Sequence, residues 1–222
     1  MPISDLAVEI NDLLSGAVAV AYTPVATAAP VNIADIVTLV GAPAVVSPWI
    51  PYGATKGGAS YGMDVKAEEL TIDQRTGAVF EDITDIVRTL KFDIAQLSPE
   101  HWKIAEQAAA IATIAAAANK SQQKVVKSGS FSEYDRYRTA FIGQRRKSQG
   151  LVTEPGGATR ACYIVLGFYS SALAATSSET KFDAGALATR SLEVKAFPDS
   201  TLTPGADTMF FFEEQPGIIT AA

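Results

Sequence analysis

The stretch Trp49–Gln96 decides the fold class of this chain: WIPYGATKGGASYGMDVKAEELTIDQRTGAVFEDITDIVRTLKFDIAQ. An aromatic residue and a proline lead into a glycine-rich turn, and polar and apolar residues then alternate. This alternation predicts one strand over Met63–Gln74, followed by Val79–Ile83 and Ile86–Leu97 as one broken strand or two separate ones. The centre of the chain is therefore expected to form a sheet.

The two faces of these strands differ in polarity. Successive side chains on a strand point to opposite faces, so Leu90, Phe92 and Ile94 are expected to face a core. The opposite face carries Thr71 and Asp73 on the first strand and Thr89, Lys91 and Asp93 on the second. These five positions are too polar for a second core, so we expect this face to line something wet or to meet a neighbour.

One helix is predicted directly after these strands. Ser98 is a suitable N-cap and Pro99 fits the first helical position. An apolar stripe follows at helical spacing, and it would pack against the inward face of the preceding strand: Ile104, Ala108, Ile111 and Ala115. The helix is expected to end near Asn119.

The remaining segments predict short strands around a single core. Turn signals bound strands at 16–24, 160–169, 189–197 and 208–214. The fold class is therefore mainly β with one flanking helix (α+β), a β-sandwich or open barrel. No linker or repeat divides the chain, so we expect one domain over 1–222, with a basic extension or inserted loop at about 120–160.

Composition narrows the functional class. The chain has 222 residues, of which 48% are hydrophobic and 19% charged, as in folded globular proteins. The single Cys162 is expected to fill the core. No basic start precedes an apolar stretch, and no apolar run reaches the ~20 residues that a membrane span needs. We expect a protein that is made and kept in the cytoplasm or released from it by lysis, with no membrane partner.

Charge is unevenly distributed. Residues 1–55 carry a net −4, the part after Lys195 another −4, and residues 120–147 a net +6 from eight basic and two acidic residues. The basic segment is interleaved with aromatic residues, which suits nucleic-acid binding, but the same residue types are enriched at protein interfaces. Since acidic partners exist in this chain, we favour contacts between subunits, made by Arg136, Arg138, Arg145, Arg146 and Lys147.

No constellation for catalysis is apparent. His101 is the only histidine, which excludes a multi-histidine metal site. Lys56 lies in GATKGG, which lacks the P-loop spacing. Glu68/Glu69 and Glu213/Glu214 are neighbours that point to opposite faces of a strand. We expect no enzyme activity, no cofactor and no metal.

Several segments, taken in order, resemble the tail tube (major tail) proteins of tailed bacteriophages, with the long non-contractile tail type favoured. GAVAVAYTPVATAAPVNIADI resembles the opening of that family, and Trp49 with Gly53–Gly58 its glycine-rich turn. The strand from Glu69 to Asp73-Gln74, the pair KFDIAQLSPEHWKIAEQ, and the closing LEVKAFPDST and FFFEEQPG are also similar. Residues 120–160 match no part of the family's pattern.

The resemblance implies a β-sandwich whose strands join a shared inner β-barrel in a hexameric ring. Rings stack into a tube in the virion tail, and double-stranded DNA passes through it without specific binding. Implied partners are copies of the chain itself, the tape measure protein, and the tail terminator and distal tail proteins. Thr71, Asp73, Thr89, Lys91 and Asp93 are the candidates for the lumen.

Alternatives from the same and other classes remain open. The inner tube of a contractile tail shares the subunit fold. A capsid decoration or head–tail connector protein is a further candidate. A small β-rich enzyme or a carbohydrate-binding module would need surface aromatic clusters with paired carboxylates, which the sequence lacks.

Overall fold

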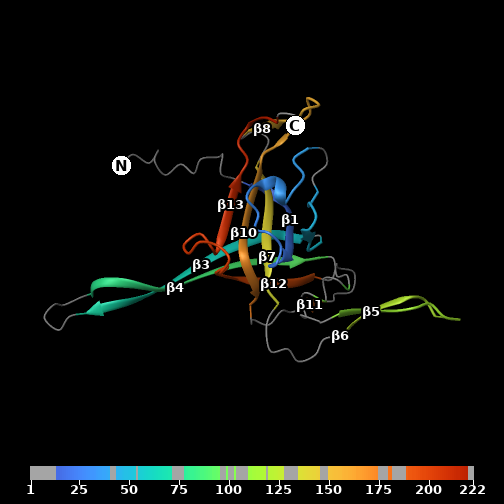
Figure 1. Ribbon diagram of the computed structural model, residues 1–222, viewed down its shortest axis with the longest axis horizontal. Helices are drawn as coiled ribbons and strands as arrows, with labels where there is room; N and C mark the ends of the chain where they lie inside the picture. The colour runs from blue at the N-terminus through green and yellow to red at the C-terminus, as the bar shows by residue number, and fades with distance from the viewer. Residues whose placement is uncertain are drawn as a thin grey trace.

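In the part of the chain that it describes, the computed structural model is mainly β-strand (Figure 1). It describes residues 14–40, 44–53, 55–71, 78–95, 99, 103, 110–118, 120–127, 135–145, 150–174, 180–181 and 189–219. The mainly β class predicted from sequence is confirmed.

Nine strands form one large sheet. Its main path runs in the order β2-β1-β7-β10-β12-β4-β3, with β11 paired to β12 and β13 paired to β10. The strands are β1 (Leu14–Pro24), β2 (Ile50–Pro51), β3 (Thr55–Thr71), β4 (Ala78–Ile94), β7 (Tyr137–Arg145), β10 (Tyr163–Leu173), β11 (Thr180–Lys181), β12 (Thr189–Phe197) and β13 (Met209–Glu213). Among the described residues, the strand pairings within this sheet are all antiparallel.

Strand β10 folds this sheet into two layers. One edge of β10 pairs with β7, while the other edge pairs with β13 over Ile164–Phe168 and with β12 over Ser170–Leu173. The register against β7 shifts between Phe168 and Ser171, at the point where β10 changes partner. In Figure 1, β1, β7, β10 and β13 therefore stand upright, and β3, β4 and β12 cross below them. Such a corner is typical of sheets packed with their strands crossing.

The main core lies between the two layers. Leu90, Phe92 and Ile94 of β4 are at most 3% exposed, which confirms the predicted inward face. Among the described residues, their partners come from both layers: Val20, Tyr22, Tyr52, Phe141, Phe168, Leu192, Val194 and Ala196. Tyr52 is buried against Phe92, with ring centroids 5.1 Å apart. Burial of large apolar side chains of this kind stabilises a fold by roughly 1.5–3 kcal/mol each.

A second core covers the other face of the upright layer. The chain after β1 passes over this face through a short 3-10 helix, η3 (Ile33–Asp35), and returns to β2. Apolar residues of this segment pack against apolar residues of the upright strands. Together they form the second core: Ala21, Ile33, Ile36, Val37, Trp49, Ala140, Ile142, Tyr163, Val165 and Phe210. Strand β7 is consequently buried on both faces. This is why three consecutive residues, Ala140, Phe141 and Ile142, are apolar. Residues 137–145 are thus a central strand, which corrects the expected extension or inserted loop at about 120–160.

The predicted helix is wrong in its second half. Pro99 and Lys103 are helical, but Ala110–Ile114 forms strand β5, paired with β6 (Gln123–Lys127). Ile104 and Ala108 lie outside the described residues. The alanines favour a helix locally, but the β-branched pair Ile111 and Val126 stands in register across the hairpin, where such residues pack well.

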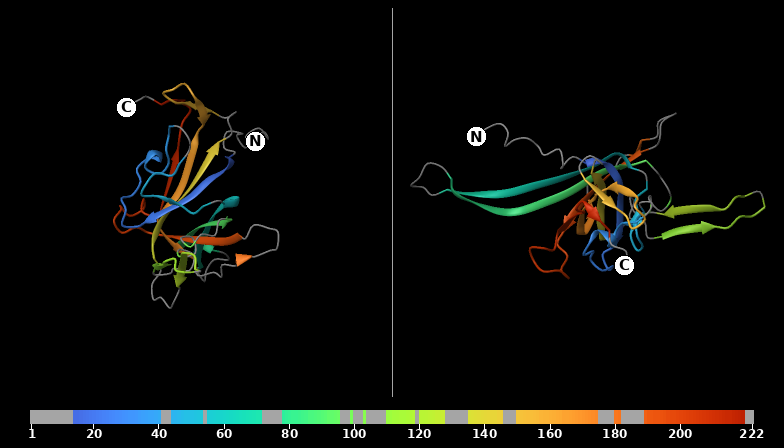
Figure 2. Two further views of the ribbon diagram at one scale, coloured as in Figure 1. Left: turned by 90° about the vertical axis from the view of Figure 1, so that its right-hand side faces the viewer. Right: turned by 90° about the horizontal axis from the view of Figure 1, so that it is seen from above.

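Three short strands make a small cap at the upper end in Figure 1, where β8 is labelled. They are β14 (Gly217–Ile218), β8 (Leu151–Thr153) and β9 (Thr159–Ala161), in that order. Two hairpins leave the body. The distal part of β3–β4 extends to one side and β5–β6 to the other, as both Figure 1 and the right-hand view of Figure 2 show.

Candidate functional site

The outward face of the β12–β4–β3 layer is mostly polar. Three of the five residues proposed for a lumen belong to it: Thr89, Lys91 and Asp93 of β4. Thr71 ends β3, and Asp73 lies outside the described residues. Because paired residues of neighbouring strands share a face, this surface also includes Ser191, Glu193 and Lys195 of β12 and Ser60, Asp64 and Lys66 of β3.

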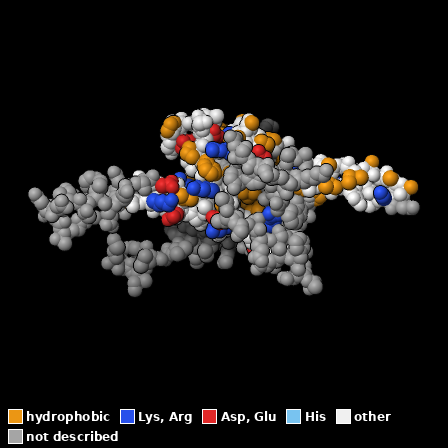
Figure 3. Space-filling view, turned by 90° about the horizontal axis from the view of Figure 1, so that it is seen from below, with side chains coloured by type: hydrophobic (Ala, Val, Ile, Leu, Met, Phe, Trp, Pro, Cys, Tyr) orange, Lys and Arg blue, Asp and Glu red, His pale blue; other side chains and the backbone are white. Residues whose placement is uncertain are grey.

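Opposite charges are paired across this face. Lys91 Nζ lies 3.0 Å from Glu193 Oε2, and Ser191 Oγ donates a 2.5 Å hydrogen bond to Asp93 Oδ1. Further out, Lys66 approaches Asp85 at 3.7 Å. Seen from below in Figure 3, basic and acidic side chains lie next to each other where the β3–β4 hairpin leaves the body. The face therefore presents mixed charge rather than the basic surface that would hold phosphates.

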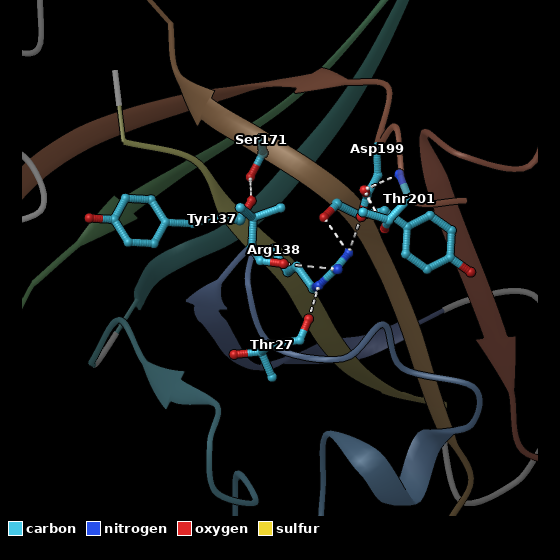
Figure 4. Close-up of polar contacts among 8 residues, drawn as sticks. Thr27, Tyr137, Arg138, Ser171, Asp199 and Thr201 are labelled. Carbon is cyan, nitrogen blue, oxygen red and sulfur yellow. Dashed lines mark hydrogen bonds and ion pairs between the residues drawn. The ribbon is translucent and has the colours of Figure 1, made fainter. Parts of the chain in front are cut away.

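Arg138, a candidate for contacts between subunits, lies inside the subunit. Its guanidinium is 3% exposed and forms an ion pair of 2.7 Å with Asp199, itself 4% exposed. It also donates to the backbone oxygens of Val25 (3.0 Å), Thr27 (2.9 Å) and Tyr169 (2.7 Å). Figure 4 shows this network joining β7, β10 and the turns after β1 and β12. A residue used in this way cannot contact a neighbouring subunit, so we remove Arg138 from the set.

The carboxylate of Asp199 is held in its charged form. Burial alone would raise the pKa of Asp199, but hydrogen bonds from the Thr201 hydroxyl and backbone N–H, and the Arg138 guanidinium, outweigh it and lower that pKa. Nearby, Ser171 Oγ donates to the Tyr137 carbonyl at 2.7 Å, where the β10 register shift interrupts the ladder. These contacts stabilise the corner between the layers, and they are structural.

The acidic end of the chain neutralises further basic residues within the subunit. Arg145 pairs with Glu213, and Arg160 makes a bidentate pair with Glu214 at 2.6 and 2.8 Å. Arg160 also donates to the Leu39 carbonyl. The charge pattern of the sequence favoured contacts between subunits, but these ion pairs lie within one subunit. Arg136 is exposed and lies over the Phe197 ring at 4.9 Å, and Arg146 and Lys147 lie outside the described residues.

The described side chains form no evident catalytic group. Among them, no cluster of three or more His, Cys, Asp or Glu residues could hold a metal ion. Cys162 is fully buried, and burial raises the pKa of its thiol, so it fills the core as predicted. His101 lies outside the described residues. Within the described ranges, no helix combines the length and apolarity needed to cross a bilayer.

An exposed apolar row on the β3–β4 hairpin was not predicted from the sequence. Beyond the body, Met63 and Val65 of β3 and Ile83 and Ile86 of β4 are each at least 40% exposed. The pairings Val65–Ile86 and Ala67–Ile83 place the row on one face, in line with Tyr61 and Leu90 at the core. The alternation of Tyr61, Met63 and Val65 is the signal that could have revealed it.

No protein-family model matches this chain, and no curated protein is similar enough in sequence to count as a relative.

Proposed function

We propose that this protein is the tail tube subunit of a tailed bacteriophage with a long, non-contractile tail. Six copies close into a ring, and rings stack into the tube through which double-stranded DNA is delivered. The chain would act as a structural protein of the virion without catalytic activity. It would meet the tape measure protein in the lumen and the tail terminator and distal tail proteins at the tube ends.

One observation carries this proposal: a polar sheet face ends in a long unpaired edge. Among the described residues β3 pairs only with β4, so its other edge presents unpaired backbone hydrogen-bonding groups along a strand of 17 residues. Such an edge invites pairing with another chain, and closure of a sheet into a barrel removes it. If copies join through this edge, the polar face of β12, β4 and β3 continues around a ring and can line a channel.

The charges of this face suit the passage of DNA. Lys91 is paired with Glu193, and the acidic Asp93 lies beside them, so no excess of positive charge is available to retain phosphates. Repulsion from a carboxylate is screened over ~8 Å at physiological salt, which keeps DNA from adhering without stopping it. Replacing Asp93 by lysine in phage particles should leave tails assembled but slow DNA ejection, measured by dye uptake after receptor addition. Unchanged ejection would contradict the assignment of this face.

Site-specific labelling of purified, assembled protein tests the architecture. Cys162 is buried, so an introduced cysteine is the one that a reagent reaches. A cysteine at Lys91 reports on the polar face. A cysteine at Gly156 reports on an open turn of the cap, where nothing lies within 4 Å of an added Cβ. In tubes seen by electron microscopy, a small maleimide should label both variants. A maleimide on a large polymer should label only Gly156→Cys. After dissociation, both reagents should label both variants.

Two results would overturn the proposal. One is a protein that stays monomeric at every concentration and forms neither rings nor tubes. The other is equal labelling of Lys91→Cys and Gly156→Cys by the large reagent in intact tubes.

A further inference from the structure

The two hairpins that leave the body lack the support of a third strand. Among the described residues, β5 and β6 form a two-stranded sheet of their own, and the distal part of β3 pairs with β4 alone. A two-stranded hairpin is marginally stable in water by itself, and three strands or a packed face are needed for independent stability. Both hairpins are therefore expected to be completed by contact with something else.

Each hairpin carries apolar side chains that the body does not cover. On the β3–β4 arm, which we define as the described residues 63–71 and 78–86, Met63 is 57% and Ile83 63% exposed. On the β5–β6 hairpin, residues 110–127, Ile114 is 51% exposed, and Figure 3 shows apolar side chains along its length. Exposed rows of this kind mark interaction sites when they gather on one element.

The arm and the hairpin have opposite charge. The arm contains six acidic residues and one basic residue, a net −5. Its register sets Glu68 opposite Asp82 and Glu69 opposite Glu81, and like charges directly opposite each other destabilise a ladder. The β5–β6 hairpin contains three lysines, Lys120, Lys124 and Lys127, and no acidic residue.

We infer that the β3–β4 arm of one copy docks on the β5–β6 hairpin of a second copy of this chain. The two elements point in opposite directions from the body, so the arm is remote from the hairpin of its own copy (Figures 1 and 2). Contact between them joins different copies head to tail, and such a heterologous contact generates a ring or a filament. The lysines relieve the repulsion within the acidic arm, and the apolar rows are buried together.

The size of this contact explains why it acts in assembly rather than in an isolated dimer. The arm beyond Gly62 has nine residues on β3, a length of about 30 Å at ~3.3 Å per residue. A ribbon of two strands offers less than the ~800 Å² per partner of a standard stable interface. Each copy both donates an arm and receives one, so the contact is multiplied in a closed or stacked assembly. Its place in a tube rests on the proposed function, whereas the contact itself requires only two copies.

Charge reversal with rescue by mixing tests the contact. The arm variant carries Glu68→Lys, Glu69→Lys, Glu81→Lys and Asp82→Lys, and the hairpin variant carries Lys120→Glu, Lys124→Glu and Lys127→Glu. Each variant alone places like charges in every contact, so its concentration for half-maximal assembly should rise by roughly tenfold or more in light scattering. Mixed in equal amounts, the two variants should assemble like the parent. A chain carrying both sets of changes should also assemble by itself.

Cysteine pairs give a readout that does not depend on charge. Copies with Met63→Cys, mixed with copies carrying Ile114→Cys, should form a disulfide-linked dimer under mild oxidation. Copies with Met63→Cys mixed with Gly156→Cys should form none. These cysteine variants keep all the charged residues. For the charge-reversal variants, circular dichroism checks that each one is folded.

The outcomes separate this inference from the proposed function. If the parent forms tubes and the reversed variants assemble equally well alone, the contact is refuted and the tube proposal stands. If mixing restores association but electron microscopy shows neither rings nor tubes, the contact stands and the tube proposal fails. Failure of both the mixture and the doubly reversed chain to associate refutes the contact, as does a parent that is monomeric at every concentration.

Discussion

Replacing Arg138 by methionine should destabilise the subunit strongly, because it leaves a buried carboxylate without its cation. Asp199 is 4% exposed and would retain only its hydrogen bonds from Thr201. Three backbone carbonyls would also lose their donor. Removing one partner of a buried ion pair costs about 3–5 kcal/mol. With a urea dependence of ~3 kcal/mol per molar, the unfolding midpoint should fall by about 1–2 M.

The effect of Arg138→Met should depend on pH. The pKa of Asp199 is lowered in the folded parent, so its contribution to stability is present above the unfolded pKa of about 3.9 and is lost as pH falls through the folded value. In the variant the carboxylate loses the cation that helps to lower its pKa. The difference in unfolding free energy between parent and variant should therefore be largest near neutral pH and should shrink below about pH 4.

Urea titrations followed by tryptophan fluorescence, at a concentration where light scattering shows no assembly, measure both effects. Arg136→Met is the matched control, because Arg136 is exposed and a cation–π contact at such a site contributes only about 0.5–1 kcal/mol. Combining Arg138→Met with Asp199→Asn should cost less than the sum of the two single changes, since the buried charge is then gone. A midpoint for Arg138→Met that equals that of Arg136→Met would refute this account of the network.

Two further predictions concern packing in the body. Phe92→Ala should cost about 3–5 kcal/mol in urea unfolding, because the ring is 3% exposed between the layers, whereas Phe211→Ala, at 53% exposed, should change the midpoint little. Equal midpoints for the two variants would contradict the assigned inward face. Gly167→Ala should abolish soluble expression, since an added Cβ would lie 2.5 Å from a backbone carbonyl oxygen of β7, while Gly156→Ala meets open space and should express like the parent. Normal yield and melting of Gly167→Ala would show that β7 and β10 are not packed this closely.

Alternation allowed the strands of the crossing layer to be predicted. Leu192, Val194 and Ala196 alternate with polar residues, and β12 (Thr189–Phe197) has the bounds predicted from that pattern. The same period placed Leu90 and Phe92 in the core. Whether a strand has one polar and one apolar face depends on its own sequence alone, so a local pattern is enough to predict these faces.

Other parts depended on contacts between distant segments, which no local pattern contains. Strand β7 is buried on both faces, so it lacks alternation, and its arginines resembled a solvated basic segment. Arg138 is buried only because Asp199, 61 positions away, meets it. At Ala110–Ile114 the alanines indicated a helix, but pairing with Gln123–Lys127 prevailed. That the outer edge of β3 is unpaired likewise becomes evident only from the order of all the strands in the sheet.

The ion pairs inside the body bear on which charges remain for assembly. Arg138, Arg145 and Arg160 are each matched by a carboxylate of the same subunit, so these three charges are neutralised before any copy meets another. The β5–β6 hairpin contains lysines and no acidic residue, and the β3–β4 arm has acidic residues at paired positions of its two strands. Exposed single pairs contribute only about 0–1 kcal/mol, but a head-to-tail contact repeats them in every copy. Association through the hairpins should therefore weaken as salt rises, while the stability of the subunit, held by buried pairs, should change little.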